Sequence, residues 1–174
     1  MKTWNTLLLL MPMALIAVAC DDDDDSLDYM QNQEFVSRAA SSNTFEIEAG
    51  ELAVEQGTDD RVVEYGEHMV VDHGAAGAEL EALAMAKDWN VPDGLMEREQ
   101  EMLDELRMLE GAAFDQLFAQ MMVQSHEEAV ELFERASGPQ GVADNELREW
   151  AAEKLPTLRA HLEDAQMLND QINP

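Results

Sequence analysis

The sequence predicts an all-α protein, and its longest segments predict a four-helix bundle. Alanine, leucine, methionine and glutamate dominate the chain, and the alternating apolar and polar runs of half-buried strands are nearly absent. Turn signals rich in glycine and proline divide the chain into a few long segments with helical periodicity. Roughly 130 residues follow the N-terminal region, enough for one domain with one core.

Two separate helices are expected before residue 57. The first would be short, from about Asp28 to Ala40, and would stand outside the bundle as an extra N-terminal helix. The second is expected from Thr44 to Gln56, because Asn43 is a suitable N-cap and Gly57 a suitable stop. Small residues on one face of this second helix predict the close approach of a neighbouring helix.

The next helix is expected to be long, from Asp59 to about Lys87, with Thr58 as its N-cap. Its apolar stripe advances in alternating steps of four and three residues, which suits antiparallel packing in a bundle. The stripe consists of Val62, Gly66, Met69, His73, Ala76, Leu80 and Leu83. A turn-rich linker at 88–94 then leads into an amphipathic segment from Leu95 to Leu109.

Two further long helices complete the expected bundle. They are predicted from Ala112 to Ala136, after a break at Gly111, and from Asp144 to about Leu168. Pro156 lies inside the last helix, where it removes a backbone donor and is expected to bend the axis. The amphipathic segment at 95–109 would form a helical crossover between the second and third bundle helices.

The N-terminus resembles a bacterial lipoprotein signal. Lys2 precedes an apolar run at 7–19 that is too short for a typical membrane span. The run ends in AVAC, which is similar to a lipobox, where cleavage precedes a diacylated cysteine. Cys20 is the one cysteine in the chain, so it is the expected lipidation site and an internal disulfide is excluded. The predicted organisation is a signal peptide at 1–19, a lipidated cysteine and acidic tether at 20–33, and a bundle domain at 34–170.

Five aspartates, Asp21 to Asp25, open the predicted tether. Their repulsion would keep a solvated spacer extended. An acidic run directly after the lipidated cysteine also resembles the surface-export signal of some Gram-negative lipoproteins, whereas aspartate at this place marks inner-membrane retention in others. We therefore expect a lipid-anchored protein of the cell envelope, at the periplasmic or cell-surface face of the outer membrane, with the membrane as its partner.

Charge and missing motifs exclude several classes of function. The chain carries 38 acidic and 10 basic residues, for a net charge of −28 at pH 7. This charge argues against nucleic acid as a partner, because binding nucleic acid requires clustered lysine and arginine. P-loop, GxGxxG, GxSxG and HExxH motifs are absent from the sequence, so nothing in it favours a hydrolase or a dinucleotide-dependent enzyme.

Three of the four histidines are expected inside the bundle at one height. His68 shares its helical face with acidic residues and is expected at the surface. His73, His126 and His161 instead fall among apolar residues, each near the middle of a different helix. Because a mid-helix residue lies near the bundle midplane whichever way its helix runs, the three imidazoles could meet at one level.

An inward carboxylate could complete a metal site with these rings. Glu46 shares the small-residue face of its helix, and hydrogen bonds from Asp72 or Asp115 could orient the rings. Three imidazoles and one carboxylate would suit one divalent ion of zinc, iron or copper. In the alternative, the histidines only form hydrogen bonds within the core, and Glu46 is the capping-box residue of a helix that begins after Asn43. The paired Glu-x-x-His motifs of di-iron proteins are missing, which argues against ferroxidase chemistry.

The chain resembles a bacterial family called domain of unknown function 4142 in four segments. These are FEIEAGELA, MVVDH, GAAFDQLFAQMMVQSHEEAVELFE and LPTLRAHLEDA. The resemblance implies a ferritin-like helical bundle in the periplasm or outer membrane, without an established activity. Phe118 fills a position where the family has an aromatic residue. The recurring polar positions of the family correspond here to Glu46, Asp72, His73, Asp115, His126 and His161.

The sequence therefore favours a non-enzymatic envelope lipoprotein whose bundle binds one metal ion through inward histidines and a glutamate. One alternative is a purely structural or protein-interaction bundle, in which the histidines serve the core. A less favoured alternative is a metal-dependent redox enzyme, which would need an open coordination position and a path for substrate.

Overall fold

The computed structural model describes Met1 and residues 30–174. The predicted signal peptide, Cys20 and the aspartate run lie outside the described residues. The described part of the chain is helical, with five helices and no extended strand. They are α1 (Asn32–Gln56), α2 (Asp60–Ala86), α3 (Glu97–Arg107), α4 (Ala112–Ser137) and α5 (Asn145–Ile172). None of these helices is both long enough and apolar enough to cross a membrane.

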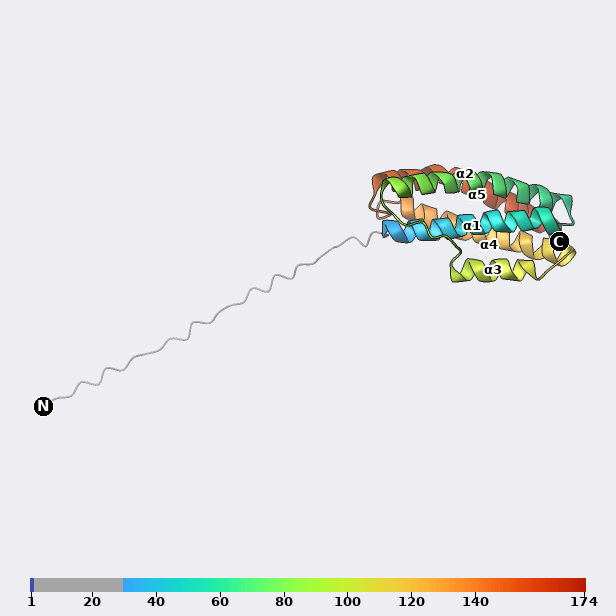
Figure 1. Ribbon diagram of the computed structural model, residues 1–174, viewed down its shortest axis with the longest axis horizontal. Helices are drawn as coiled ribbons and strands as arrows, with labels where there is room; N and C mark the ends of the chain where they lie inside the picture. The colour runs from blue at the N-terminus through green and yellow to red at the C-terminus, as the bar shows by residue number, and fades with distance from the viewer. Residues whose placement is uncertain (2–29) are drawn as a thin grey trace.

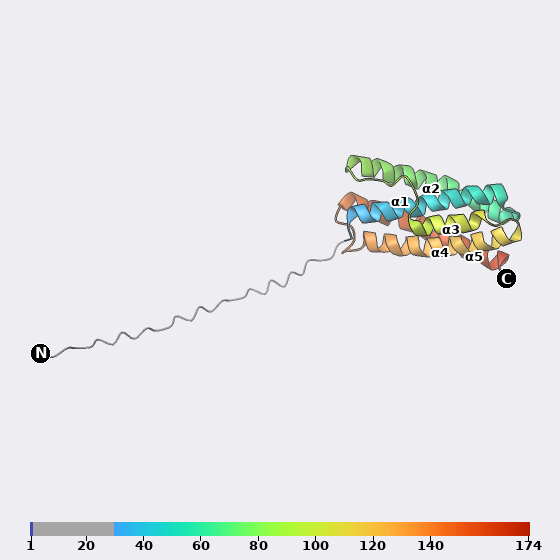
Figure 2. The same ribbon diagram turned by 60° about the horizontal axis from the view of Figure 1, so that its bottom comes forward.

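The four long helices form the bundle, and α3 lies against its side. α1 packs chiefly on α2, and α4 chiefly on α5. In Figure 1, α1 and α5 run in one direction while α2 and α4 run in the other. The connection at 87–111 therefore travels back along the bundle between two parallel helices, and it carries α3. Figure 2 shows α3 beside α1 and α4, in agreement with the predicted helical crossover.

The prediction of two helices before residue 57 is wrong, because α1 is continuous from Asn32 to Gln56. The expected break fell at Ser41, Ser42 and Asn43, residues that favour caps over helix interiors. Here the Ser41 hydroxyl donates to Glu99 at 3.1 Å and accepts from the backbone N–H of Met96 at 2.8 Å. The side chains of Ser41 and Asn43 bond to other helices rather than to their own backbone, and α1 continues through them. The extra N-terminal helix is therefore the first half of α1.

The N-cap of α2 also differs from the prediction. Asp59 rather than Thr58 caps the helix, and its carboxylate accepts the backbone N–H of Arg61 at 2.9 Å. The last two helices agree with their predicted ranges to within a few residues, and Asp144 caps α5 by accepting the backbone N–H of Leu147. Pro156 lies inside α5 as expected.

The core consists of two apolar clusters separated by a polar layer. The first contains Phe35, Leu80 and Phe133, with Phe35 and Phe133 packed edge to face at 5.1 Å between ring centroids. The second contains Phe45 and Phe118 together with residues near the other ends of the helices. Between the clusters lie the buried polar residues of the mid-bundle: Glu46, His73, Ser125, His126 and His161. Burying this polar layer between two apolar clusters costs free energy unless its polar groups have hydrogen-bond or other polar partners.

Helices α1 and α2 lie in close contact where Gly50 and Gly66 meet. A Cβ atom added to Gly66 would lie 2.7 Å from both the Gly50 carbonyl oxygen and the Ala53 Cβ. A Cβ added to Gly50 would lie 2.8 Å from the Gly66 carbonyl oxygen. Because these neighbours are backbone or Cβ atoms, they cannot rotate away. The small face predicted for the second half of α1 is thus the contact with α2.

Replacing Gly66 with alanine is expected to destabilise the protein by about 1 to 3 kcal/mol, because the added methyl group forces α1 and α2 apart. Gly74, on the same helix, is the matched control, since nothing lies within 4 Å of an added Cβ there. Gly74→Ala is expected to stabilise by up to about 1 kcal/mol through helix propensity. Urea unfolding followed by circular dichroism measures both changes. Equal effects at the two positions would contradict the close-packing argument.

Candidate metal centre

The three predicted inward histidines meet in the polar layer of the bundle. His73 comes from α2, His126 from α4 and His161 from α5, and their side chains are exposed by 6%, 0% and 3%. The ring centroids are 5.6 Å apart for His73 and His126, 5.3 Å for His73 and His161, and 5.4 Å for His126 and His161. The rings therefore form a nearly equilateral triangle. The prediction that they share one height is confirmed.

Each ring has one nitrogen engaged by an acceptor. The Nδ1 atom of His73 lies 3.2 Å from the Asn43 side-chain oxygen, and the Nδ1 atom of His126 lies 2.9 Å from its own helix's Met122 carbonyl. The Nε2 atom of His161 lies 3.0 Å from an Asp72 carboxylate oxygen. All three acceptors are oxygens, so each engaged ring nitrogen carries the proton. The other nitrogen of each neutral ring then carries a lone pair that is free to bind a metal ion.

The remaining nitrogens are the ones available to a metal ion. His73 Nε2, His126 Nε2 and His161 Nδ1 are buried and have no hydrogen-bond partner among the described residues. The three rings offer one nitrogen each, all within 4.8 Å of one another. Nitrogens bound to one zinc ion at about 2.1 Å are about 3.4 Å apart in a tetrahedron, so inward shifts of less than about 1 Å would bring the rings to bonding distance.

Burial keeps the three rings neutral. Desolvation lowers the pKa of His126 from 6.5 to about 4, against the opposing effect of its hydrogen bond to Met122. The pKa of His73 falls well below 6.5, first through desolvation and then through the neighbouring rings. Desolvation also lowers the pKa of His161, although its bond to Asp72 opposes the shift. Neutral imidazoles are the form that binds metal, so no deprotonation is needed near pH 7.

Glu46 is buried as expected, but the structure does not bring it into the histidine group. Its Oε1 atom lies 3.7 Å from the Nδ1 atom of His126, the nitrogen already bound to Met122. Glu46 thus faces the edge of the ring that points away from the free nitrogens. The capping alternative is wrong as well, because α1 runs through Asn43 and no helix begins there.

The carboxyl group of Glu46 has no partner of normal geometry within the described part of the chain. Desolvation raises its pKa from 4.5 to about 8, although the nearby Ser125 hydroxyl opposes this rise. Glu46 is therefore mostly protonated at pH 7. It adds a proton-bearing group to the layer rather than a negative charge.

Asp72 has the orienting position that the sequence suggested. One of its carboxylate oxygens lies 3.0 Å from His161 Nε2 and 3.1 Å from His68 Nε2. His68 is half exposed at the surface, paired with an acid as predicted. A carboxylate behind a histidine fixes the ring's tautomer and orientation. Asp72 therefore directs the Nδ1 atom of His161 toward the other two rings.

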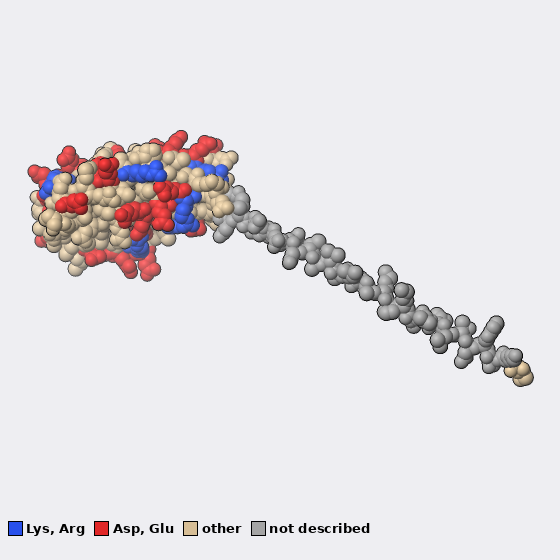
Figure 3. Space-filling view, turned by 180° about the vertical axis from the view of Figure 1, so that it is seen from behind, with Lys and Arg blue, Asp and Glu red and all other residues tan. Residues whose placement is uncertain are grey.

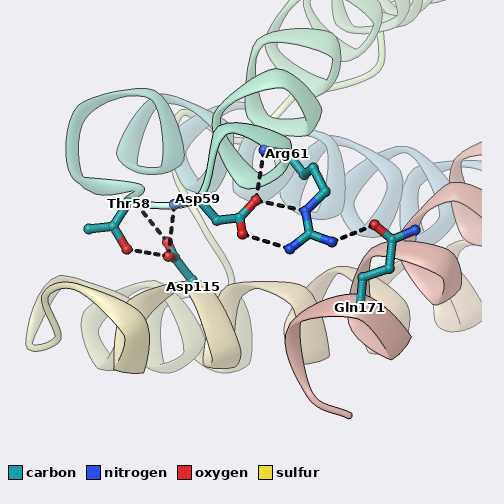
Figure 4. Close-up of polar contacts among 5 residues, drawn as sticks. All are labelled: Thr58, Asp59, Arg61, Asp115 and Gln171. Carbon is teal, nitrogen blue, oxygen red and sulfur yellow. Dashed lines mark hydrogen bonds and ion pairs between the residues drawn. The ribbon is translucent and has the colours of Figure 1, made fainter.

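Asp115 does not orient a histidine, contrary to the expectation for this residue. Figure 4 shows its carboxylate accepting the backbone N–H groups of Thr58 and Asp59, each at 3.0 Å, together with the Thr58 hydroxyl. These are donors at the start of α2, which no residue within that helix can satisfy. Asp115, from the first turn of α4, therefore ties the α1–α2 turn to α4 at the end of the bundle.

A cavity of about 50 Å³ adjoins the histidine cluster. Its lining includes the polar residues His73, His161, Asn43 and Asp72 and apolar residues such as Leu80 and Phe133. At about 10 to 15 Å³ for each water, it has room for a few waters or another small molecule.

Asn43 is the site residue whose role sequence reasoning missed. The sequence predicts a helix cap at this position, whereas in the structure the Asn43 side-chain oxygen lies 3.2 Å from His73 Nδ1, across the α1–α2 interface. Asn43 precedes Glu46 by three residues, so both lie on the same face of a helix. That spacing was the available signal, and it required a continuous α1 to be recognised.

The fold and the site together define a helical-bundle protein with a cluster of three buried histidines at its centre. The family model described as "Domain of unknown function (DUF4142)" matches residues 22–168. The chain belongs to this family, as the four resembling segments predicted. No curated protein and no solved structure matched the chain.

Proposed function

We propose that this protein is an envelope lipoprotein whose bundle binds one divalent metal ion through His73, His126 and His161. The observation that carries this proposal is a cluster of three buried histidines that can offer ligand nitrogens within 4.8 Å of one another, each with one ring nitrogen that has no partner among the described residues. Buried polar atoms in native proteins are nearly always hydrogen-bonded, and a group left without a partner calls for an explanation. A shared ion would satisfy all three nitrogens at once.

The ligand chemistry favours zinc or copper(II) over iron. The group consists of neutral imidazoles, and Glu46 lies outside it. Imidazole suits both zinc and copper, whereas a site without carboxylate lacks the oxygen ligands of the di-iron proteins. Three protein ligands also leave one coordination position for water.

The anchoring part of the proposal rests on the N-terminal sequence. The AVAC segment ending at Cys20 supports a diacylated cysteine, and the run of helices around a long crossover supports a ferritin-like bundle beyond the tether. Cells grown with radioactive palmitate are expected to label the wild type and not Cys20→Ala. Absence of label in the wild type would remove the anchor.

A second candidate function is metal-dependent chemistry on a small molecule. It is favoured by the cavity beside His73 and His161, which offers the space next to a three-ligand metal that such chemistry needs. Binding of azide to the cobalt-substituted protein, seen as a change in its visible spectrum, would support this candidate. An unchanged spectrum would contradict this second candidate and leave metal binding as the proposed function.

Metal binding itself is tested by equilibrating the full-length chain with zinc, copper or iron and measuring retained metal by mass spectrometry. At one equivalent, the wild type is expected to retain zinc or copper, and His126→Ala to bind at least about 100-fold more weakly. His68→Ala is the matched control, because His68 is outside the inner group and should not affect the first ion. A wild type that stays metal-free with all three metals would end the proposal.

A further inference from the structure

We propose that His68, Asp72 and the Nε2 atom of His161 form a second divalent-cation site, and that His161 joins it to the first as a bridging imidazolate. The inference rests on the proposed function, because the bridge requires an ion at the inner group. It also gives a role to His68, which the inner site does not use.

The outer group has ligand atoms already at metal-like spacing. His68 and Asp72 are four residues apart on α2, so they project from one helical face toward His161 on α5. His68 Nε2 and His161 Nε2 lie 3.1 and 3.0 Å from the same Asp72 oxygen, and the three ligand atoms lie within 4.8 Å of one another. Ligands of one zinc ion are about 3.4 Å apart, so two of the three separations need little change.

Exposure increases step by step from the inner group to solvent. The His161 side chain is 3% exposed, Asp72 is 35% exposed and His68 is 50% exposed. An ion at the outer group would therefore be reachable from water, while the inner ion would be enclosed. His161 stands at the boundary, with Nδ1 on the inner side and Nε2 on the outer side.

The charges around the outer group favour a cation. The surface groove that His68 lines also holds Glu64 and Asp164, together with one basic residue, Arg61. The guanidinium of Arg61 is bound by Asp59 and the side-chain oxygen of Gln171, and so does not compete for this site. The chain as a whole carries a net charge of −28 at pH 7, and red acidic side chains outnumber blue basic ones on the face that Figure 3 shows, so cations are attracted to the protein as a whole.

The proton balance of the bridge can be stated for each atom. Before the second ion binds, His161 carries one proton, on Nε2, and donates it to Asp72. The second ion forms a bond to Nε2, and this proton leaves to solvent. Nδ1 keeps its bond to the inner ion, Asp72 changes from hydrogen-bond acceptor to ligand, and His68 binds through Nε2 with its proton on Nδ1. No oxidation or reduction takes place.

Copper(II) alone is the probe, because two copper(II) ions on one imidazolate are magnetically coupled. The full-length chain is saturated with copper, freed of loosely bound metal by gel filtration, and examined by mass spectrometry and electron paramagnetic resonance. We expect two coppers per chain and a coupled spectrum in the wild type. His68→Ala should retain one copper with the spectrum of an isolated ion. His126→Ala, in which the first ion binds at least about 100-fold more weakly, should show no coupled pair. Glu64→Gln controls for a general loss of surface charge and should keep the coupled pair.

The outcomes that overturn the inference differ from failure of the inner site. The wild type could bind one copper per chain that is lost in His126→Ala and kept in His68→Ala. This result would support the inner site and contradict the outer one, whose residues would then only be hydrogen-bonded to one another. Two coppers with uncoupled spectra would overturn the shared ring. If no copper is lost in His126→Ala, the proposed function fails. Circular dichroism of each variant confirms that the bundle is folded.

Discussion

Replacing Glu46 with glutamine is expected to raise the free energy of unfolding of the metal-free protein at pH 7 by about 2 to 3 kcal/mol. In the wild type, burial raises the pKa of Glu46 from 4.5 to about 8. Ionisation of this carboxyl group at pH 7 therefore stabilises the unfolded state relative to the folded state, by about 1.4 kcal/mol for each pH unit above the ordinary pKa. Glutamine has nearly the same shape and does not ionise on unfolding, so this loss of stability disappears.

The sign of the effect fixes its pH window. The folded-state pKa of Glu46 lies above the unfolded value, so its contribution to stability is complete below pH 4.5 and is lost as pH rises toward 8. His126 acts in the opposite sense: its pKa falls from 6.5 to about 4, so its contribution is complete above pH 6.5 and is lost as pH falls. The two effects oppose each other between pH 4.5 and 6.5, and Glu46→Gln should uncover the histidine slope.

Urea unfolding at several pH values, after treatment with a chelator, measures both profiles. Glu51→Gln is the control, because Glu51 is exposed on the same helix and should show no comparable gain. A Glu46→Gln variant that is no more stable than the wild type at pH 7 would mean that the carboxylate is charged and paired in the native protein. The same variant should bind the first metal ion about as tightly as the wild type, since Glu46 faces away from the free nitrogens.

The histidine cluster could be predicted because it depends on position along helices rather than on loop geometry. His73, His126 and His161 each lie near the middle of a long helix with strong apolar periodicity. An error of a residue or two at a helix end changes the height of a central residue by only about 1.5 Å per residue. The helical class and the crossover at 87–111 followed from the same periodicity and from turn residues.

The errors arose where local preference and tertiary contact disagree. Ser41 and Asn43 resemble cap residues when only neighbouring positions are considered, but Ser41 binds the first turn of α3 and the residue before it, and Asn43 binds His73. Glu46 could be assigned to the inner face but not to one edge of the His126 ring, because that choice depends on the ring's rotation. Periodicity determines which face a residue occupies, and it does not determine which atom of a neighbour it meets.

Asp115 is the clearest case, and replacing it with alanine is expected to destabilise the protein by about 3 to 5 kcal/mol. The carboxylate is 3% exposed and accepts three hydrogen bonds from Thr58 and Asp59. Its removal leaves two backbone N–H groups at the start of α2 without their acceptor, at a cost of about 1 to 3 kcal/mol for each buried group. It also breaks the tie between α4 and the α1–α2 turn (Figure 4).

Thr58→Val serves as the matched control, because it removes only the hydroxyl bond and keeps the size of the side chain. It should cost about 1 kcal/mol.

The two aspartates that the sequence proposed as orienting groups can then be separated by function. Asp72→Ala should weaken the first metal ion by about 10- to 100-fold, since Asp72 fixes the ring of His161. Asp115→Ala should lower stability in urea and leave metal affinity unchanged, because none of its hydrogen bonds reaches a histidine. A loss of metal affinity in Asp115→Ala without loss of stability would restore the orienting role and contradict the structural one.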